Sequence, residues 1–218
     1  MNALRKEQVE EHAADDPADP GLATDEERSV DQLIRENAQL RRMLSRLQGF
    51  RTLAYRDQLT ELWNRRYFDE RMAEELSRAR RDSQRRFSLM IVDVNDLKRI
   101  NDNEGHAAGD LAIKWAAGFL KRSLRDTDII CRTGGDEFTV IFPELGLEDC
   151  SKLVARLRRL LREAATRGEA RLGLSIGTAS YPDSATSLRG LVEGADSAMY
   201  SDKREQKRHT DPGMQSAR

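Results

Sequence analysis

Two short apolar runs, at residues 128–131 and 138–142, flank a pair of glycines and constrain the fold more than any other feature of the sequence. Runs of this length and composition are typical of strands, and a glycine pair between them is typical of the tip of a β-hairpin. Asp136 and Glu137 follow the glycines directly, where the backbone can approach a ligand and carboxylates can reach a hard cation. The pattern predicts a site for phosphate and magnesium. The alternative is an ordinary hairpin whose two acids are solvated.

The residues at 134–138, Gly-Gly-Asp-Glu-Phe, resemble the signature of the GGDEF family of diguanylate cyclases. Members of that family condense two GTP molecules into cyclic di-GMP and two pyrophosphates. The resemblance extends over residues 55–208 and implies an α/β (α+β) fold, a ferredoxin-like palm with a mixed sheet and surrounding helices. The predicted order of strand, helix, hairpin, helix, strand and helix agrees with this fold.

The apolar pattern locates these elements along the chain. We predict strands at 87–95 and 170–179 besides the hairpin, and helices at 65–81, 111–124, 147–166 and 187–208. Asn64 is expected to cap the first of these helices. Four side chains of the second helix are expected to face the core, namely Leu111, Trp115, Phe119 and Leu120. We place His106 in a loop before that helix, in a structural rather than a catalytic role.

Asp93 stands at the carboxyl end of the first predicted strand, a common place for magnesium in α/β folds. By the resemblance, Asp93, Asp136 and the Val94 carbonyl hold two Mg²⁺ ions, for which Mn²⁺ could substitute. The resemblance gives Glu137 one of two roles, completing the second metal site or accepting the proton of the 3′-hydroxyl group. Asp136 and Glu137 are therefore the predicted catalytic residues.

The resemblance also assigns contacts to the substrate, GTP. Asn101 and Asp110 read the guanine base, and the chemistry agrees, because a carboxylate accepts hydrogen bonds from N1–H and the exocyclic amine, an arrangement that adenine lacks. The remaining substrate contacts that the resemblance implies are Lys98, Lys203, Lys207, Gly134 and Gly135. The last two lysines lie one turn apart on one face of the last predicted helix.

The sequence departs from the family's pattern at four positions. Glu61 replaces a glycine before the first helix, and we expect it to alter a turn rather than the chemistry. Asn95 and Leu97 replace Asp and Phe in a segment that in the family mainly offers backbone amides to the phosphates. Asp202 replaces an alanine in the closing motif on the last helix.

Arg125 and Asp128 form an Arg-x-x-Asp pattern, and five residues separate Asp128 from Gly134. In the family this spacing marks a site at which cyclic di-GMP inhibits its own synthesis. Arg can bind phosphate or stack on guanine while Asp fixes it, so the residue types suit a cyclic dinucleotide. The alternative is a solvated helix end, where this pattern is common.

The N-terminal part of the chain differs from the rest. Residues 1–28 carry nine acidic and three basic side chains, which predicts a flexible acidic tail. Residues 29–56 follow a heptad pattern that predicts a parallel coiled-coil stalk, with an amphipathic helix packed on its own domain as the alternative. The a positions are Val30, Asn37, Leu44 and Arg51, and the d positions are Leu33, Leu40, Leu47 and Ala54. We predict the catalytic domain at 57–208 and a flexible C-terminus at 209–218.

The stalk is expected to make a homodimer, because each domain would bind one GTP and two must face each other across a dyad. Since 218 residues leave no room for a sensor domain, we expect a cytosolic regulatory protein to bind within residues 1–50.

Nucleic acid and membrane are not expected as partners, because the domain is only mildly basic and no apolar run could span a bilayer. Two cysteines give no disulfide framework, which fits a cytoplasmic location.

Two other function classes are alternatives to a diguanylate cyclase. A non-catalytic receptor for GTP or cyclic di-GMP would keep the fold and the Arg125/Asp128 site without turnover, but the intact acids and guanine contacts argue against it. A plain coiled-coil adaptor would leave every motif after Asp57 without a function.

Overall fold

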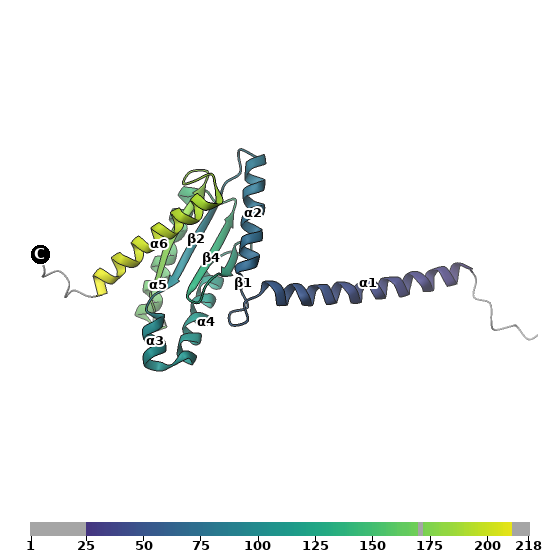
Figure 1. Ribbon diagram of the computed structural model, residues 1–218, viewed down its shortest axis with the longest axis horizontal. Helices are drawn as coiled ribbons and strands as arrows, with labels where there is room; N and C mark the ends of the chain where they lie inside the picture. The colour runs from purple at the N-terminus through teal and green to yellow at the C-terminus, as the bar shows by residue number, and fades with distance from the viewer. Residues whose placement is uncertain (1–24, 170–171, 211–218) are drawn as a thin grey trace, which may run out of the picture. The chain divides into compact units, whose positions relative to one another are not determined.

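The computed structural model describes residues 25–169 and 172–210 (Figure 1). Residues 1–24 of the predicted tail and 211–218 of the predicted C-terminal segment lie outside the described residues. Contacts within the chain divide it into two units, Met1–Gly49 and Phe50–Arg218. None of the helices in the described ranges is long and apolar enough to cross a membrane.

The described part of the first unit is helical. Helix α1 covers Asp25–Tyr55 and continues into the second unit. Its heptad side chains Val30, Leu33, Leu40 and Leu44 are between 54% and 62% exposed. α1 is therefore a helix over the predicted heptads with an uncovered apolar stripe, and the pairing of two such helices stays a prediction.

The second unit is built on a five-stranded mixed sheet with the strand order β1-β3-β4-β2-β5. The strands are β1 (Trp63–Asn64), β2 (Phe87–Val94), β3 (Ile129–Arg132), β4 (Glu137–Pro143) and β5 (Leu174–Tyr181). β1 pairs with β3 in parallel, and the other pairs are antiparallel. The predicted hairpin is confirmed as β3 and β4, and β2 is the strand between β4 and β5. The strand predicted from residue 170 begins later, at Leu174.

Helices cover both faces of this sheet (Figure 1). The second unit contains α2 (Arg65–Arg81), α3 (Leu97–Glu104), α4 (His106–Ser123), α5 (Leu147–Thr166) and α6 (Leu188–Thr210), of which α3 lies beside α4. One core lies between the sheet and helices α4 and α5, where Leu120 and Leu157 are buried. A second core lies between the sheet and helices α2 and α6, where Met72 and Leu191 are buried. The three layers form the mixed-sheet palm that the sequence predicts.

The bounds of α2 and α5 agree with the prediction, and local sequence signals account for those of α2. The Asn64 side chain accepts a hydrogen bond from the Tyr67 N–H and so caps α2. Phe68, Met72 and Leu76 recur at helical spacing on α2 and are buried.

The segment containing α3 and α4 differs from the prediction. α4 begins at His106, so placing this residue in a loop was wrong, and α3 was not foreseen. Gly105 separates the two helices with a φ of 83°, a conformation that glycine adopts at little cost. The face of α4 that packs on the core carries Ile113 and Ala116, while Leu111 lies outside that face and is 68% exposed. Placing Leu111 in the core was therefore wrong. The other predicted core side chains of α4 do pack against the core, namely Trp115, Phe119 and Leu120.

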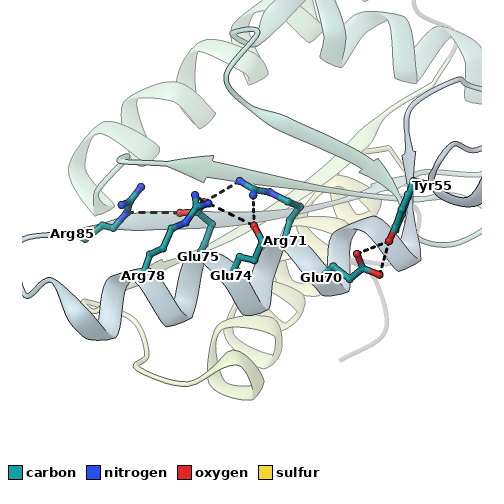
Figure 2. Close-up of polar contacts among 7 residues, drawn as sticks. All are labelled: Tyr55, Glu70, Arg71, Glu74, Glu75, Arg78 and Arg85. Carbon is teal, nitrogen blue, oxygen red and sulfur yellow. Dashed lines mark hydrogen bonds and ion pairs between the residues drawn. The ribbon is translucent and has the colours of Figure 1, made fainter. Parts of the chain in front are cut away.

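A buried ionic cluster joins α2 to the start of β2 (Figure 2). Glu75 is fully buried and lies 3.1 Å from Arg71, 3.0 Å from Arg78 and 3.8 Å from Arg85. A carboxylate removed from water needs such partners, because an unpaired buried charge strongly destabilises a fold. The cluster is therefore structural and lies outside the candidate site.

Candidate active site

The antiparallel pairing of β2 and β4 brings the predicted acidic residues to one end of the sheet. Asp93 lies opposite Glu137 in the strand register, and the Val94 N–H donates to the Asp136 carbonyl oxygen at 3.0 Å. Ile91 packs in the core under α2 and α6, and Asp93, two residues further along β2, faces the same side. The sheet therefore sets three carboxylates beside Val94.

The carboxylates of this site repel one another. Burial raises the pKa of Asp93, the Asp136 charge raises it further, and Lys203 opposes both. Burial also raises the pKa of Glu137, and the charges of Asp136 and Asp93 add to that effect. A bound cation relieves repulsion of this kind. The site therefore has the electrostatic character of a cation site.

The residues present fit Mg²⁺. In nucleotide sites this ion is held by one or two carboxylates together with substrate phosphates and water, rather than by a cage of protein ligands. Consistent with that, residues 25–169 and 172–210 contain no group of three or more His, Cys, Asp or Glu side chains arranged to hold a metal ion by themselves. Asp93 and Asp136 would supply the two carboxylates, and Val94 would add a carbonyl oxygen.

The two glycines of the turn have different surroundings. A Cβ at Gly134 would lie 3.0 Å from Oε2 of Glu137, so packing against that side chain favours glycine. A Cβ at Gly135 would meet nothing within 4 Å, and this residue is exposed. Packing within the chain thus accounts for Gly134, whereas Gly135 leaves bare backbone on the wall of a neighbouring cavity.

That cavity, of about 550 Å³, lies between the turn and helices α3 and α4. Its wall brings together the predicted residues Lys98, Asn101, Asp110, Gly135 and Asp136. The Asn101 Oδ1 atom is buried and has no hydrogen-bond partner in the described part of the chain. A buried acceptor requires a donor, and a base N–H would supply one. Gly109 provides the space, because a Cβ there would collide with this oxygen. Gly109 was not among the site residues predicted from the sequence.

Helix α6 places the two predicted phosphate-binding lysines near the carboxylates. The Lys203 ammonium lies 2.6 Å from Oδ1 of Asp93. Lys207 is exposed one turn further along, and its charge lowers the pKa of Asp93. Both lysines therefore act electrostatically on the proposed metal end of the site.

Arg132 connects the turn to the start of the domain, and the sequence analysis missed it. Its Nη1 lies 3.2 Å from both carboxylate oxygens of Asp57, and its Nη2 donates to the Gly135 carbonyl at 2.7 Å. Burial alone would raise the pKa of Asp57, but hydrogen bonds from Thr60 and Arg132 outweigh it and hold the pKa below its usual range. No local pattern predicts this link, because its partners are far apart in the sequence.

A second cavity, of about 1040 Å³, lies at the opposite end of β4 from Glu137. Arg125 and Asp128 line it together with Arg156 of α5. Oδ2 of Asp128 accepts a hydrogen bond from the Arg125 N–H at 2.8 Å, and burial raises the pKa of Asp128. The Arg-x-x-Asp pattern therefore borders a cavity that is separate from the carboxylate site.

Comparisons with known proteins agree with these features. Residues 54–209 match the family described as diguanylate cyclase, GGDEF domain. Two relatives from Pseudomonas aeruginosa are each 35% identical, the bifunctional diguanylate cyclase/cyclic di-GMP phosphodiesterase MucR over 150 residues and the diguanylate cyclase TpbB over 160 residues. The aligned regions cover 68% and 70% of this chain but only 22% and 36% of those relatives.

Solved structures also resemble the chain. The coiled coil and GGDEF domain of DgcB from Caulobacter crescentus, solved with c-di-GMP, has a TM-score of 0.67 at 25% identity and covers 80% of this chain and 94% of that one. The diguanylate cyclase SiaD from Pseudomonas aeruginosa, solved with its activator SiaC, has a TM-score of 0.64 at 30% identity and covers 82% of this chain and 69% of that one. With its signature turn, its palm fold and a family match over residues 54–209, the chain belongs to the GGDEF family of diguanylate cyclase domains.

Proposed function

We propose that this protein condenses two GTP molecules into cyclic di-GMP and two pyrophosphates. One observation carries the proposal: Asp136, next to the facing pair Asp93 and Glu137, lines the same cavity as Asn101. The buried side-chain oxygen of Asn101 has no hydrogen-bond partner in the described residues. The carboxylates suit a cation, and the oxygen suits a guanine N–H. Relatives described as diguanylate cyclases support this activity.

Asp93, Asp136 and the Val94 carbonyl would hold two Mg²⁺ ions, with Mn²⁺ as a substitute. When bound, these ions supply positive charge that stabilises the attacking oxygen and the phosphates in the transition state. Glu137 would accept the proton of the 3′-hydroxyl group or ligate the second ion, and its raised pKa suits a proton acceptor.

The GTP contacts would come from three helices and the turn. Asn101 and Asp110 would read the guanine in the cavity between α3 and α4. The phosphate contacts are proposed for Lys98, Lys203, Lys207, Gly134 and Gly135.

A homodimer formed through α1 would bring two loaded domains together, because each domain holds one GTP. The exposed side chains of Val30, Leu33, Leu40 and Leu44 supply an apolar seam for a second copy. Asn37 at an a position would fix the register of a parallel pair. The similarity to DgcB, solved with its coiled coil, supports this assembly.

A cytoplasmic regulatory protein is proposed to bind within residues 1–50. A coiled coil of three to four heptads is marginally stable, so a protein that binds it can shift the population toward the active pair. SiaD, solved with its activator, supports a partner of this kind.

Product inhibition is proposed at the second cavity through Arg125 and Asp128, whose residue types suit a cyclic dinucleotide.

Incubation of the purified chain with Mg²⁺ and either GTP or ATP, followed by chromatography, tests the activity. GTP should yield cyclic di-GMP, and ATP should yield no cyclic dinucleotide. Asp136→Ala should abolish turnover without lowering the melting temperature, whereas the exposed control Asp183→Ala should match the wild type. Binding of GTP without product would identify a receptor, and turnover in Asp136→Ala would contradict the mechanism.

A further inference from the structure

Side chains of α6 close the free edge of the sheet. β5 is an edge strand that pairs only with β2, so alternate backbone groups face outward. The Ile176 N–H donates to Oδ2 of Asp202 at 2.7 Å, and Nε2 of Gln206 donates to the Leu174 carbonyl at 3.0 Å. Asp202 is only 10% exposed in its side chain and also accepts from Arg158 of α5 at 2.8 Å. These bonds fix the position of α6 against β5 and α5.

The same hydrogen bonds continue to the residue after β2. Oε1 of Gln206 accepts from Nδ2 of Asn95 at 2.9 Å, and Oδ1 of Asn95 accepts from the Ser175 hydroxyl at 2.8 Å. The Asn95 N–H donates to the Gly173 carbonyl at 2.9 Å. A Cβ at Gly173 would lie 2.9 Å from Nδ2 of Asn95, so glycine leaves room for the contact between Asn95 and Gln206. Asn95 directly follows Val94, and the bonds therefore reach the proposed metal site.

The donors and acceptors of Gln206 determine which residue suits position 95. Nε2 of Gln206 donates to the Leu174 carbonyl and, at 2.9 Å, to the Asp202 carboxylate. Neither of these acceptors can donate in return, so Oε1 of Gln206 has to face Asn95. The side chain there must then donate, as Asn does and an ionised Asp does not. Asn95 and Asp202, two of the four departures from the family's pattern, thus lie at opposite ends of one hydrogen-bonded chain.

This chain of bonds also sets the position of the lysines. Lys203 follows Asp202 directly, and Lys207 follows Gln206. The Lys203 ammonium reaches Asp93 at 2.6 Å while α6 is held against β5. A shift or rotation of α6 along the edge would carry both lysines away from the end of β2, because a helix moves as a rigid element.

We infer that Asn95, Asp202 and Gln206 are positioning residues that hold the Lys203 and Lys207 face of α6 in place to bind the triphosphate. The inference rests on the proposed function, because it assigns those lysines to GTP. It also predicts that substitutions at 95 and 206 have non-additive effects on nucleotide affinity, because both act through the side-chain amide of Gln206.

A double-mutant cycle between these two positions tests the inference. We would measure the affinity of each variant for Mg²⁺ with guanosine 5′-[α,β-methylene]triphosphate, which cannot react, and the KM and kcat for GTP. Asn95→Asp should weaken analogue binding and raise KM by about tenfold, because a carboxylate then faces Oε1 of Gln206. Gln206→Met should have a similar effect, since it removes the hydrogen bonds of the Gln206 amide to Asn95, the Leu174 carbonyl and Asp202. The double variant should match Gln206→Met to within about threefold rather than show the roughly hundredfold loss of two independent effects.

The cycle controls for the added negative charge, because Asn95→Asp introduces the same carboxylate into the wild type and into Gln206→Met. Asn103→Asp, which makes the same change at an exposed position of α3, should leave analogue affinity unchanged. A purely structural role would lower the melting temperature and the active fraction without changing the affinity of the folded protein. Additive effects of the substitutions at 95 and 206 on analogue affinity, or unchanged affinity in Asn95→Asp, would overturn the inference. Formation of cyclic di-GMP by the wild type would still support the proposed function in that case. A wild type that neither binds the analogue nor forms cyclic di-GMP would contradict both the inference and the proposed function.

Discussion

The ammonium group of Lys203 lies 2.6 Å from Oδ1 of Asp93 and joins α6 to the carboxyl end of β2. The side chains are 27% and 9% exposed, so the pair is largely shielded from water. Lys203, which is proposed to bind phosphate, thus neutralises Asp93, a proposed metal ligand, in the ligand-free chain.

This pairing predicts opposite effects of Lys203→Met on two ligands. Binding of Mn²⁺ without nucleotide, followed by electron paramagnetic resonance, should tighten, because the ion no longer competes with the ammonium group for Asp93. The KM for GTP should rise about tenfold or more, because charge-assisted contacts to phosphate are lost. Arg204→Met removes the same charge from an exposed position of α6 and should change neither value. Weaker Mn²⁺ binding in Lys203→Met would contradict the competition.

Glu137→Gln should stabilise the ligand-free domain while it lowers activity. Burial and the charges of Asp136 and Asp93 raise the Glu137 pKa above its ordinary value of 4.5, so the ionised form is disfavoured in the folded state. Wild-type stability should therefore fall as pH rises through the range just above that value. The gain in the variant should stay below about 1 kcal/mol, since water screens this partly exposed group. Melting curves without metal or nucleotide would detect it, and a lower melting temperature would contradict the repulsion.

Asp57→Asn should destabilise the domain in a pH-dependent way. Because the folded pKa of Asp57 is lowered, the ionised group adds stability that is present above the unfolded value and is lost as pH falls through the folded value. We expect a loss of about 1–2 kcal/mol at pH 7 that shrinks below the ordinary value of 3.8. Urea unfolding of both proteins between pH 7 and 3 measures the difference. A loss that does not change with pH would rule out the ion pair with Arg132 as its source.

Arg125→Ala should relieve inhibition by cyclic di-GMP. Loss of a guanidinium contact in the second cavity should raise the inhibition constant about tenfold or more and leave initial rates unchanged, because the cavity is separate from the carboxylates. Lys121→Ala, at an exposed position near the end of α4, serves as the control. Equal inhibition of Arg125→Ala and the wild type would exclude the site.

Deletion of residues 1–50 should yield a monomer with low activity at low protein concentration. Higher concentration should restore turnover, because the catalytic domains then meet without the stalk. In the full chain, Leu33→Glu with Leu40→Glu should act like the deletion, whereas Arg35→Glu on the polar face should not. Sedimentation together with rates across a dilution series measures both effects. A truncated protein that stays a fully active dimer on dilution would exclude a role for α1.

The sequence by itself determined the features that depend on near neighbours. The cap at Asn64 and the periodic side chains fix the bounds of α2, because helix ends and amphipathic faces are set within a few residues. The glycine turn and its two apolar flanks gave the β3–β4 hairpin, and its signature identified the family. Asp93, Asp136 and Glu137 could be predicted as site residues because each stands in a local pattern, at a strand end or directly after the glycine pair.

Tertiary structure decided the contacts between distant parts of the chain. Arg132 meets Asp57 because the fold brings the segment after α1 to β3. Lys203 meets Asp93 and Gln206 meets Asn95 only because packed layers fix which faces of α6 and the sheet oppose each other. Local periodicity contains no information on that choice, since it marks an apolar face without naming the surface that covers it. The exposure of Leu111 shows the same limit, because the face of α4 that packs on the core carries Ile113 and Ala116 and leaves Leu111 outside it.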